Sequence, residues 1–382
     1  MKYDIRLSAH AKAEISCYEE GSDASEFHVM LHCTCPDSTW EEQLRTLHEA
    51  YGLLLEEKRL KGAVAVFKRY FLSDAANQAD YLQAVLAEGG GCACSIVEQP
   101  PLDGTKVALW VYMLTGVQTQ VLHNGLVEVK HGVYRHFWGG SAFNRAATSE
   151  YQTRLLLNDY VMQLTQVECR LSDNCIRTWF FVQNVDVNYG GVVKARNEVF
   201  ATQNLTENTH YIASTGIGGR HADHKVLVQM DTYAVDGLAP GQIRYLYAPT
   251  HLNPTYEYGV SFERGTCVEY GDRRHVFISG TASINNKGEV VHPRDIRRQT
   301  ERMWENVEAL LTEAGCTFED VGQIIVYLRD MADYRVVKDL HDRRFPHIPK
   351  VLVLAPVCRP GWLVEMECMA VKTVRQNDFP PF

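Results

Sequence analysis

Two glutamates in the last apolar segment of the chain have the residue type and spacing for proton transfer. Residues 363–371 are predicted to form a β-strand in which Glu365 and Glu367 are two positions apart, so their side chains share one face of a sheet. A carboxyl group that is partly screened from water can have its pKa raised enough to act as a general acid at neutral pH. The alternative is that both glutamates are solvated, or pair with arginines of a neighbouring part of the protein.

Positively charged candidates lie before this strand and in the middle of the chain. Arg359 stands at a Pro-Gly turn that leads into the strand of Glu365, and its guanidinium could bind a substrate carboxylate; a surface arginine is the alternative. Cys358 could line the same pocket, but no histidine follows at a spacing that would predict a nucleophile. Arg177 and Arg196 could add positive charge across the cleft. For Arg196, on a predicted helix, a position at the surface is the favoured alternative.

The elements that must position these residues follow one order in the last third of the chain. An apolar stripe at helical spacing predicts an amphipathic helix over residues 295–313, and Asp330 is predicted to cap a second helix that runs to Arg344. Short apolar runs predict strands at residues 276–279, 323–328, 351–354 and 363–371.

The same pattern recurs twice upstream. Residues 66–85 and 321–340 both place an acidic N-cap two residues after an apolar strand and a tyrosine in the following helix. The middle of the chain repeats the pattern more weakly, with helices over 151–167 and 191–200 and strands over 176–182 and 226–235. Repeats of this length indicate stacked or symmetric units. We therefore predict three units, residues 1–115, 116–240 and 241–382, separated by residues 115–125, the glycine-rich stretch 131–140 and residues 236–254.

Composition limits the possible functions. The chain has 382 residues, 46% of them hydrophobic, and a net charge of −9, which argues against a nucleic-acid or anionic-membrane partner. No segment approaches the roughly 20 apolar residues of a membrane span, and no signal peptide is visible, so a cytoplasmic protein with reduced thiols is expected. The pairs Cys33/Cys35 and Cys92/Cys94 are predicted to be buried, and residues 219–224 to be a solvated loop, so no metal and no cofactor are predicted.

Five ordered motifs carry a family resemblance. The segments ISGTASINNKGEVV, NVEALLTEAG, IIVYLRDMADY, RFPHIPKV and LVEMECMAV between residues 260 and 371 resemble the Rid/YjgF (endoribonuclease L-PSP-like) family. Members of this family form trimers with sites between subunits. The resemblance implies an α+β fold of three tandem Rid/YjgF-like (chorismate-mutase-like) units, with helix-backed sheets forming an internal pseudo-trimer. The chain would then be a monomer or a low-order homo-oligomer.

A second resemblance covers more of the chain. The segments SGTAS at 279–283, His-Pro at 292–293, Cys-Arg at 358–359, VEME at 364–367, Arg-x-Trp at 177–179 and 213–218 are similar to segments of chorismatases. This similarity implies that Glu365 is the proton donor. It also places further residues at a site for a small carboxylated metabolite: Arg359, Cys358, Glu367, Arg177, Ser214 and Thr215. Tyr258, with Phe262 and Arg264, lies where Rid enzymes carry an aromatic residue at the site mouth; packing between units is the alternative.

Departures from these patterns leave three functions open. Imine-hydrolysing Rid enzymes carry an arginine two residues after the Phe-Pro pair, where this chain has Ile348; Ser214 and Cys94 are the expected matches upstream. A 2-imino or enamine acid deaminase is therefore the weaker alternative. In the predicted middle helix Ala195 stands where chorismatases carry a tyrosine, which leaves Arg359 as the one carboxylate clamp. A metal-independent, chorismatase-like hydrolase or lyase is the leading hypothesis, and a non-catalytic metabolite-binding or interaction protein is the third.

Overall fold

The first part of the chain folds into a mixed six-stranded sheet backed by helices. The computed structural model describes residues 1–20, 24–87 and 91–382. The strands of this sheet are β1 (Lys2–Arg6), β2 (Ala11–Tyr18), β3 (Glu26–Cys33), β4 (Val64–Leu72), β5 (Ala93–Glu98) and β6 (Val107–Leu114), in the spatial order β1-β2-β3-β6-β4-β5. β4 and β5 are parallel, and the other neighbours are antiparallel.

Two more sheets repeat this topology along the chain. The second contains β7 (Gln118–Val121), β8 (Val127–His131), β9 (Tyr134–Phe143), β10 (Cys175–Val182), β11 (Ala213–Gly218) and β12 (Val228–Asp236). The third contains β13 (Ile243–Leu246), β14 (Gly265–Glu269), β15 (Arg273–Ala282), β16 (Val321–Leu328), β17 (Lys350–Leu354) and β18 (Val364–Thr373). Within the described residues, the three sheets share one strand order, which confirms the predicted repeat.

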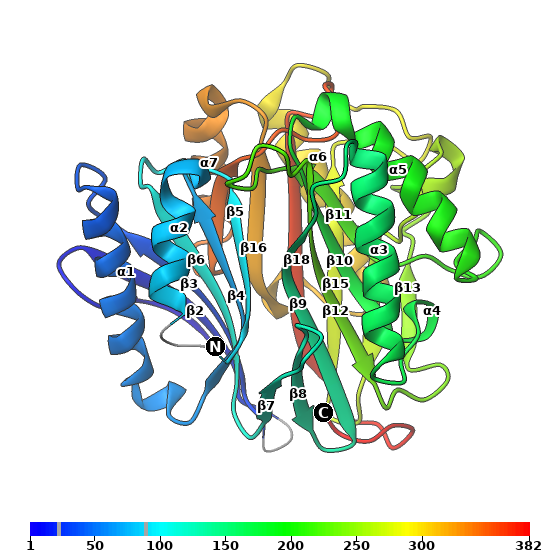
Figure 1. The fold of residues 1–382 in the computed structure, drawn as a ribbon, viewed down its shortest axis with the longest axis horizontal. Coiled ribbons are helices and arrows are strands. Elements are labelled where there is room, and N and C mark those ends of the chain that lie inside the picture. Colours follow the sequence, from blue (N-terminus) through cyan, green and yellow to red (C-terminus); the bar gives the residue numbers. More distant parts are fainter. Residues whose placement is uncertain (21–23, 88–90) are drawn as a thin grey trace.

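Helices cover the outer face of each sheet (Figure 1). They are α1 (Trp40–Leu55) and α2 (Ala75–Leu86) in the first unit, α3 (Ser149–Thr165), the short α4 (Leu171–Asn174) and α5 (Val185–Thr202) in the second, and α6 (Ile296–Glu313) and α7 (Tyr334–Arg344) in the third. Local sequence fixes their starts: Thr39 and Glu42 form a capping box before α1, and Asp295 caps α6. The apolar stripe of α6, which includes Met303, Val307 and Leu310, is buried on the third sheet.

The inner faces of the three sheets meet around a common centre. Phe67 of the first unit packs on Trp138 of the second with ring centroids 5.1 Å apart, and Tyr233 of the second packs on Phe277 of the third at 5.4 Å. Isolated β-bridges link each pair of units: Glu98 with Arg220, Pro101 with Val353, and Ile217 with Val357. The three units therefore form an internal pseudo-trimer in which each cleft lies between two units.

All three stretches predicted to separate the units contain parts of sheets. Residues 115–125 contain β7, residues 131–140 lie largely in β9, and residues 236–254 contain β13. The glycines in β9 misled the prediction, because they serve close packing and not a turn. A Cβ atom on Gly139 would collide with the side chain of Thr232, and one on Gly140 would collide with the backbone of Cys94 in the first unit.

Two further features are the state of the cysteines and the length and hydrophobicity of the helices. The eleven cysteines are free, with Cys33 buried and Cys35, Cys92 and Cys94 half-buried. Across residues 1–20, 24–87 and 91–382, no helix has the length and apolar character needed to cross a bilayer.

Candidate active site

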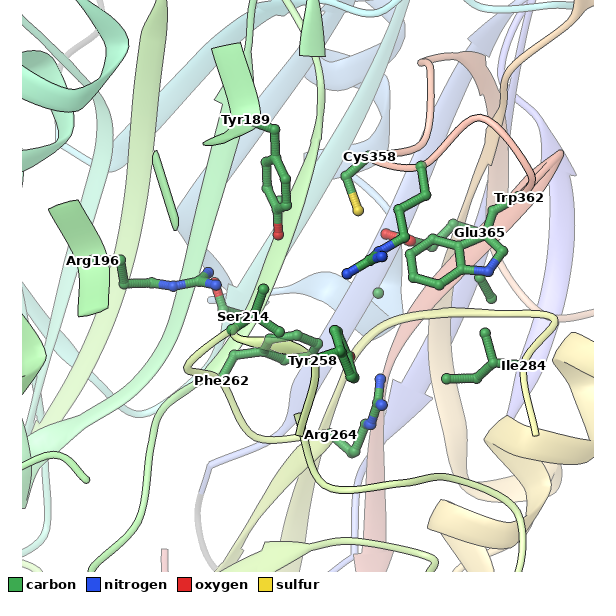
Figure 2. Close-up of a pocket in the computed structure, with 15 residues that line it drawn as sticks. Tyr189, Arg196, Ser214, Tyr258, Phe262, Arg264, Ile284, Cys358, Trp362 and Glu365 are labelled. Atoms are coloured by element: carbon green, nitrogen blue, oxygen red, sulfur yellow. The ribbon is translucent and has the colours of Figure 1, made fainter. Parts of the chain in front are cut away.

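A cavity of about 500 Å³ lies between the second and third units (Figure 2). The second unit supplies residues from α5 and β11, and the third supplies β15, β18, the segment before β14 and the turn before β18. The lining residues are Tyr189, Arg196, Ser214, Gly216, Tyr258, Val260, Phe262, Arg264, Gly280, Ala282, Ile284, Cys358, Arg359, Trp362 and Glu365.

Glu365 places a nearly buried carboxyl group in this cavity. The residue is only 4% exposed, and its carboxyl oxygens accept no hydrogen bond from the residues that the structure describes. Burial raises the pKa of Glu365 to about 8, and the negative charge of Glu367 adds to this effect; Arg177 and Arg264 oppose it. The side chain lies against the Cα of Gly280, where a Cβ atom would collide with its Oε1. Glu365 is therefore mainly protonated at neutral pH.

Arg196 is a buried cation in the same cavity, and the prediction that it lies at the surface is wrong. It is 1% exposed, and its Nε and Nη2 atoms have no hydrogen-bond partner within the described ranges. The rings of Phe180 and Phe262 lie 6.0 and 5.7 Å from its guanidinium carbon. Arg196 is buried because its face of α5 is covered by the segment of the third unit that carries Phe262.

Two more arginines approach the cavity from the third unit. Arg264 is 5% exposed, and its Nε and Nη2 atoms donate to the carbonyl oxygen of Asn253 at 3.3 and 2.9 Å. Arg359 is an exposed residue at the cavity rim. The ring of Tyr258 lies between them, 5.5 Å from the guanidinium carbon of Arg264 and 5.1 Å from that of Arg359. With Arg196, three arginines line the cavity that holds Glu365.

A thiol and a phenol complete the polar part of the wall. Burial raises the pKa of the Cys358 thiol to about 12, so it remains protonated at neutral pH. Burial also raises the pKa of Tyr189. Gly216 faces the ring of Tyr189 so closely that a Cβ atom there would meet it at 2.6 Å. Both groups are therefore uncharged hydrogen-bonding groups. Among the residues described, no cluster of three or more His, Cys, Asp or Glu side chains is placed to hold a metal ion.

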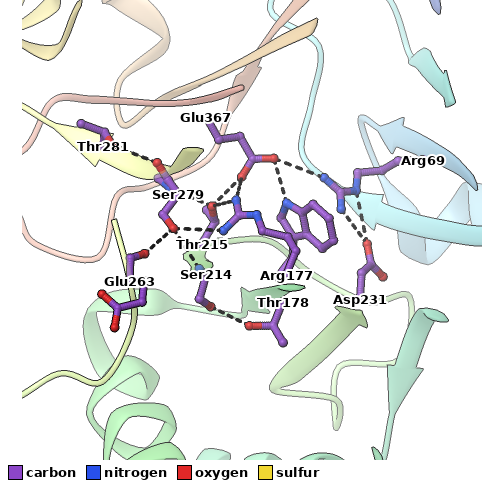
Figure 3. Close-up of polar contacts among 12 residues, drawn as sticks. Arg69, Arg177, Thr178, Ser214, Thr215, Asp231, Glu263, Ser279, Thr281 and Glu367 are labelled. Carbon is purple, nitrogen blue, oxygen red and sulfur yellow. Dashed lines mark hydrogen bonds and ion pairs between the residues drawn. The ribbon is translucent and has the colours of Figure 1, made fainter. Parts of the chain in front are cut away.

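A buried ionic cluster lies directly behind the cavity (Figure 3). Glu367 accepts hydrogen bonds from Arg177 Nη2 at 2.9 Å, Trp179 Nε1 at 2.8 Å and Thr215 Oγ1 at 2.5 Å. Arg69 of the first unit lies 3.7 Å from Glu367. The cluster thus joins all three units, and its side chains are almost fully buried. Glu367, Arg177 and Thr215 support the wall of the cavity and do not line it.

Comparison with known proteins agrees with this architecture. Residues 267–372 match the family model of endoribonuclease L-PSP. A RutC family protein of Pyrococcus abyssi is 35% identical over 100 residues, which are 25% of this chain and 78% of the relative. The chain belongs to the Rid/YjgF superfamily. The 3-aminoacrylate deaminase RutC of Acinetobacter baylyi is 29% identical over 97 residues, covering 25% of this Rid/YjgF protein and 77% of the relative.

The arrangement of all three units has a match among solved structures. A chorismatase crystal structure aligns with a TM-score of 0.63 over 82% of this chain and 95% of the chorismatase chain, at 17% sequence identity. This likeness concerns the fold. The Rid/YjgF protein therefore has the chorismatase-like architecture that its motifs indicated.

The structure brings five of the eight candidate residues together in one cavity. Glu365, Arg359, Cys358, Tyr258 and Ser214 line the cavity of this Rid/YjgF protein.

Sequence reasoning missed other parts of the wall, notably Tyr189, Gly280 and Trp362. One signal was available for the tyrosine. Tyr189 and Arg196 are seven residues, or about two helical turns, apart, so they share one face of α5.

The prediction that Ser214 in the second unit and Cys94 in the first occupy the position equivalent to Ile348 of the third unit is also wrong. In β10, Cys175 and Arg177 flank a bulge, and Thr178 follows directly after Arg177. Ser214 of β11 pairs with Thr178. The equivalent position after the bulge pairs with Cys94 in the first unit and with Lys350 in the third unit. Ser214 and Cys94 therefore correspond to Lys350, because strand pairing fixes the register that a short motif leaves open.

Proposed function

We propose that this protein is a chorismatase-like enzyme of the Rid/YjgF superfamily that hydrolyses or eliminates a group from a small carboxylated metabolite. The substrate binds in the cavity between the second and third units, and Glu365 acts as the acid/base. One observation carries the proposal: Glu365 is a buried carboxyl group that accepts no hydrogen bond from the described residues, and it lies in a cavity with three arginines, where burial raises its pKa to about 8. Such a group can donate a proton at neutral pH to a substrate that the arginines hold.

In both reactions Glu365 recovers the proton that it donates, either from water or from the substrate. In a hydrolysis, Glu365 donates its proton to the leaving oxygen as the bond between that oxygen and the substrate carbon breaks, water adds to the same carbon, and the proton lost by that water returns to Glu365. In an elimination, Glu365 protonates the leaving oxygen and recovers a proton from the substrate carbon. The low polarity around Glu365 favours its neutral form before each cycle.

The charge of the cavity favours a substrate with two carboxylates. With Glu365 neutral, Arg196, Arg264 and Arg359 are the charged groups among the lining residues. The unpartnered Nε and Nη2 atoms of Arg196 suit one carboxylate, and Arg359 suits a second nearer the rim. The sequence alone indicated one such clamp, whereas the folded protein offers a cation from each side of the cleft.

A comparison of wild type with Glu365→Gln tests the proposal. Purified protein is screened by thermal shift against chorismate, other shikimate-pathway acids and 2-oxo acids, and turnover is then measured for each acid that binds. We expect Glu365→Gln to keep binding and to lose about 10²- to 10⁴-fold in rate. The matched control is Glu301→Gln, an exposed glutamate on α6. Equal rates for wild type and Glu365→Gln would contradict the role of Glu365, and saturable binding without any turnover would indicate a metabolite-binding protein.

Imine or enamine deamination is the second candidate, and similarity to the deaminase RutC favours it. The arginine that holds the substrate carboxylate in deaminases of this type is absent, since Ile348 occupies its place in the third unit. We therefore expect no ammonia release from freshly generated 2-imino acids. Ammonia release that Glu365→Gln abolishes would instead favour the deaminase.

A further inference from the structure

One short segment separates the cavity of Glu365 from a second cavity. Phe262 lines the cavity of Glu365, Glu263 lines the second cavity, and Arg264 borders both. The backbone of Glu263 is fixed, because its N–H donates to Ile212 at 3.0 Å and its carbonyl oxygen accepts from Ser279 at 2.6 Å. The direction of its carboxylate is therefore built into the fold.

The second cavity encloses about 400 Å³ and also lies between the second and third units. Its wall is rich in tyrosine, with Tyr211 from the second unit and Tyr247 and Tyr256 from the third. Their hydroxyl groups make no hydrogen bond with residues that the structure describes, so they are available to a ligand. Glu207 adds a second carboxylate to the wall.

Glu263 is a nearly buried carboxyl group with no ion pair within the described part of the chain. It is 6% exposed, and its Oε1 atom accepts one hydrogen bond, from the backbone N–H of Tyr211 at 2.7 Å. Burial raises its pKa, and the charge of the adjacent Arg264 opposes this effect. Arg264 borders both cavities but donates its hydrogen bonds to Asn253. The Oε2 atom of Glu263 accepts no hydrogen bond from the described residues, so it is available to a ligand in the second cavity.

We propose that this second cavity binds an organic ammonium ion, with Glu263 as its counter-ion and the tyrosine rings as its walls. An ammonium group would supply the missing positive charge next to Oε2. Its carbon substituents would contact the faces of Tyr211, Tyr247 and Tyr256, and aromatic faces attract cations of this kind. Three aromatic side chains and a carboxylate around one small cavity form a site for an amine, whereas the arginines next to Glu365 form a site for an anion. This inference does not depend on the chemistry proposed for Glu365.

Calorimetric titration of the full-length protein at pH 8 tests the site. The probes are tetramethylammonium chloride and n-butylammonium chloride, with sodium chloride at equal ionic strength as the reference. We expect saturable binding of both cations to wild type and about tenfold weaker binding to Glu263→Gln. Glutamine can still accept the hydrogen bond from Tyr211, so this variant keeps the fold. Tyr247→Leu should weaken binding, whereas Tyr247→Phe should retain it, because the phenylalanine keeps the aromatic face.

Glu365→Gln separates this proposal from the previous one. It should bind both ammonium probes as wild type does, because Glu365 lies in the other cavity. Binding to Glu263→Gln as tight as to wild type, or no saturable binding of either cation to wild type, would overturn the ammonium site. Neither result would alter the expectation for carboxylic acids in the cavity of Glu365.

Discussion

Arg177 of the second unit donates a 2.9 Å hydrogen bond to Glu367 of the third, and this ion pair lies directly behind the cavity of Glu365. Glu367 and Glu365 share one face of β18, yet their surroundings give them different roles. Glu367 is surrounded by hydrogen-bond donors, including Trp179, and acts as the counter-ion of arginines from two other units. Glu365 has no such donors and faces the cavity. Two carboxyl groups on one strand thus differ in their environment, which supports a structural role for Glu367 and is the basis of the acid/base role proposed for Glu365.

The buried pair leads to a prediction about stability. Replacing Arg177 with leucine leaves Glu367 with fewer partners in a site that excludes water, so we expect a loss of about 3–5 kcal/mol in the free energy of unfolding. Urea denaturation measures this loss. The control is Arg154→Leu, which removes an arginine from the solvent-screened pairs with Glu150 and Glu198 and should change stability far less. Equal effects of the two substitutions would contradict the structural role of Arg177.

The raised pKa of Glu365 predicts the pH dependence of activity. A general acid must be protonated, so kcat is expected to fall as pH rises through about 8. Because the negative charge of Glu367 contributes to the raised pKa, Glu367→Gln should move this fall to lower pH. Rate measurements on both proteins between pH 5 and 9 test the shift. A profile for Glu367→Gln that matches wild type would show that the two carboxyl groups are not coupled.

The same pKa predicts a stability effect of defined sign. Glu365 has a folded-state pKa of about 8 against an ordinary glutamate pKa of 4.5, so the unfolded chain loses this proton at lower pH than the folded protein does. Its stabilising contribution is therefore fully present below pH 4.5 and is lost as pH rises towards 8. Glu365→Gln lacks this titration. We expect its stability relative to wild type to increase from pH 5 to pH 8 in urea denaturation, and the opposite trend would contradict a raised pKa.

Gly280 is predicted to set the position of Glu365. In Gly280→Ala the new methyl group would occupy the place of Glu365 Oε1, and the flexible carboxyl end would have to move. We expect turnover to fall by at least about tenfold with little change in stability, because a displaced acid no longer reaches the substrate atom. Gly190→Ala on α5 is the control, since a Cβ atom there meets nothing within 4 Å. Full activity of Gly280→Ala would show that the close contact is not needed.

Arg196 is predicted to strengthen binding of the substrate while lowering the stability of the free protein. Arg196→Met removes a buried cation whose Nε and Nη2 atoms have no partner, so the melting temperature should stay the same or rise. Binding of a dicarboxylate should weaken by at least about tenfold, because the substrate loses a charge-assisted contact. Thermal shift with and without ligand measures both effects. A large loss of stability in the free protein, or unchanged ligand affinity, would assign Arg196 a purely structural role.

Several features of the site could be predicted from local sequence because they depend on local rules. The side chains of Glu365 and Glu367 were placed on one strand face by their spacing of two residues, and the repeated strand–acid–helix pattern predicted three similar sheets. The Cys-Arg dipeptide at 358–359 was placed next to that strand by its turn. Each of these inferences needs only the geometry of one element and its neighbours.

The remaining features were decided by the packing of one unit on another. Arg196 was expected at the surface because one helix, considered alone, does not reveal a second partner, and the glycines of β9 resemble a linker until the backbone of Cys94 is placed against them. The sequence determined three units and a strand that carries Glu365. The tertiary structure decided that Glu365 is buried and protonated while Glu367 is paired, because desolvation and ion pairing depend on atoms that are far apart in the chain and adjacent only in the folded protein.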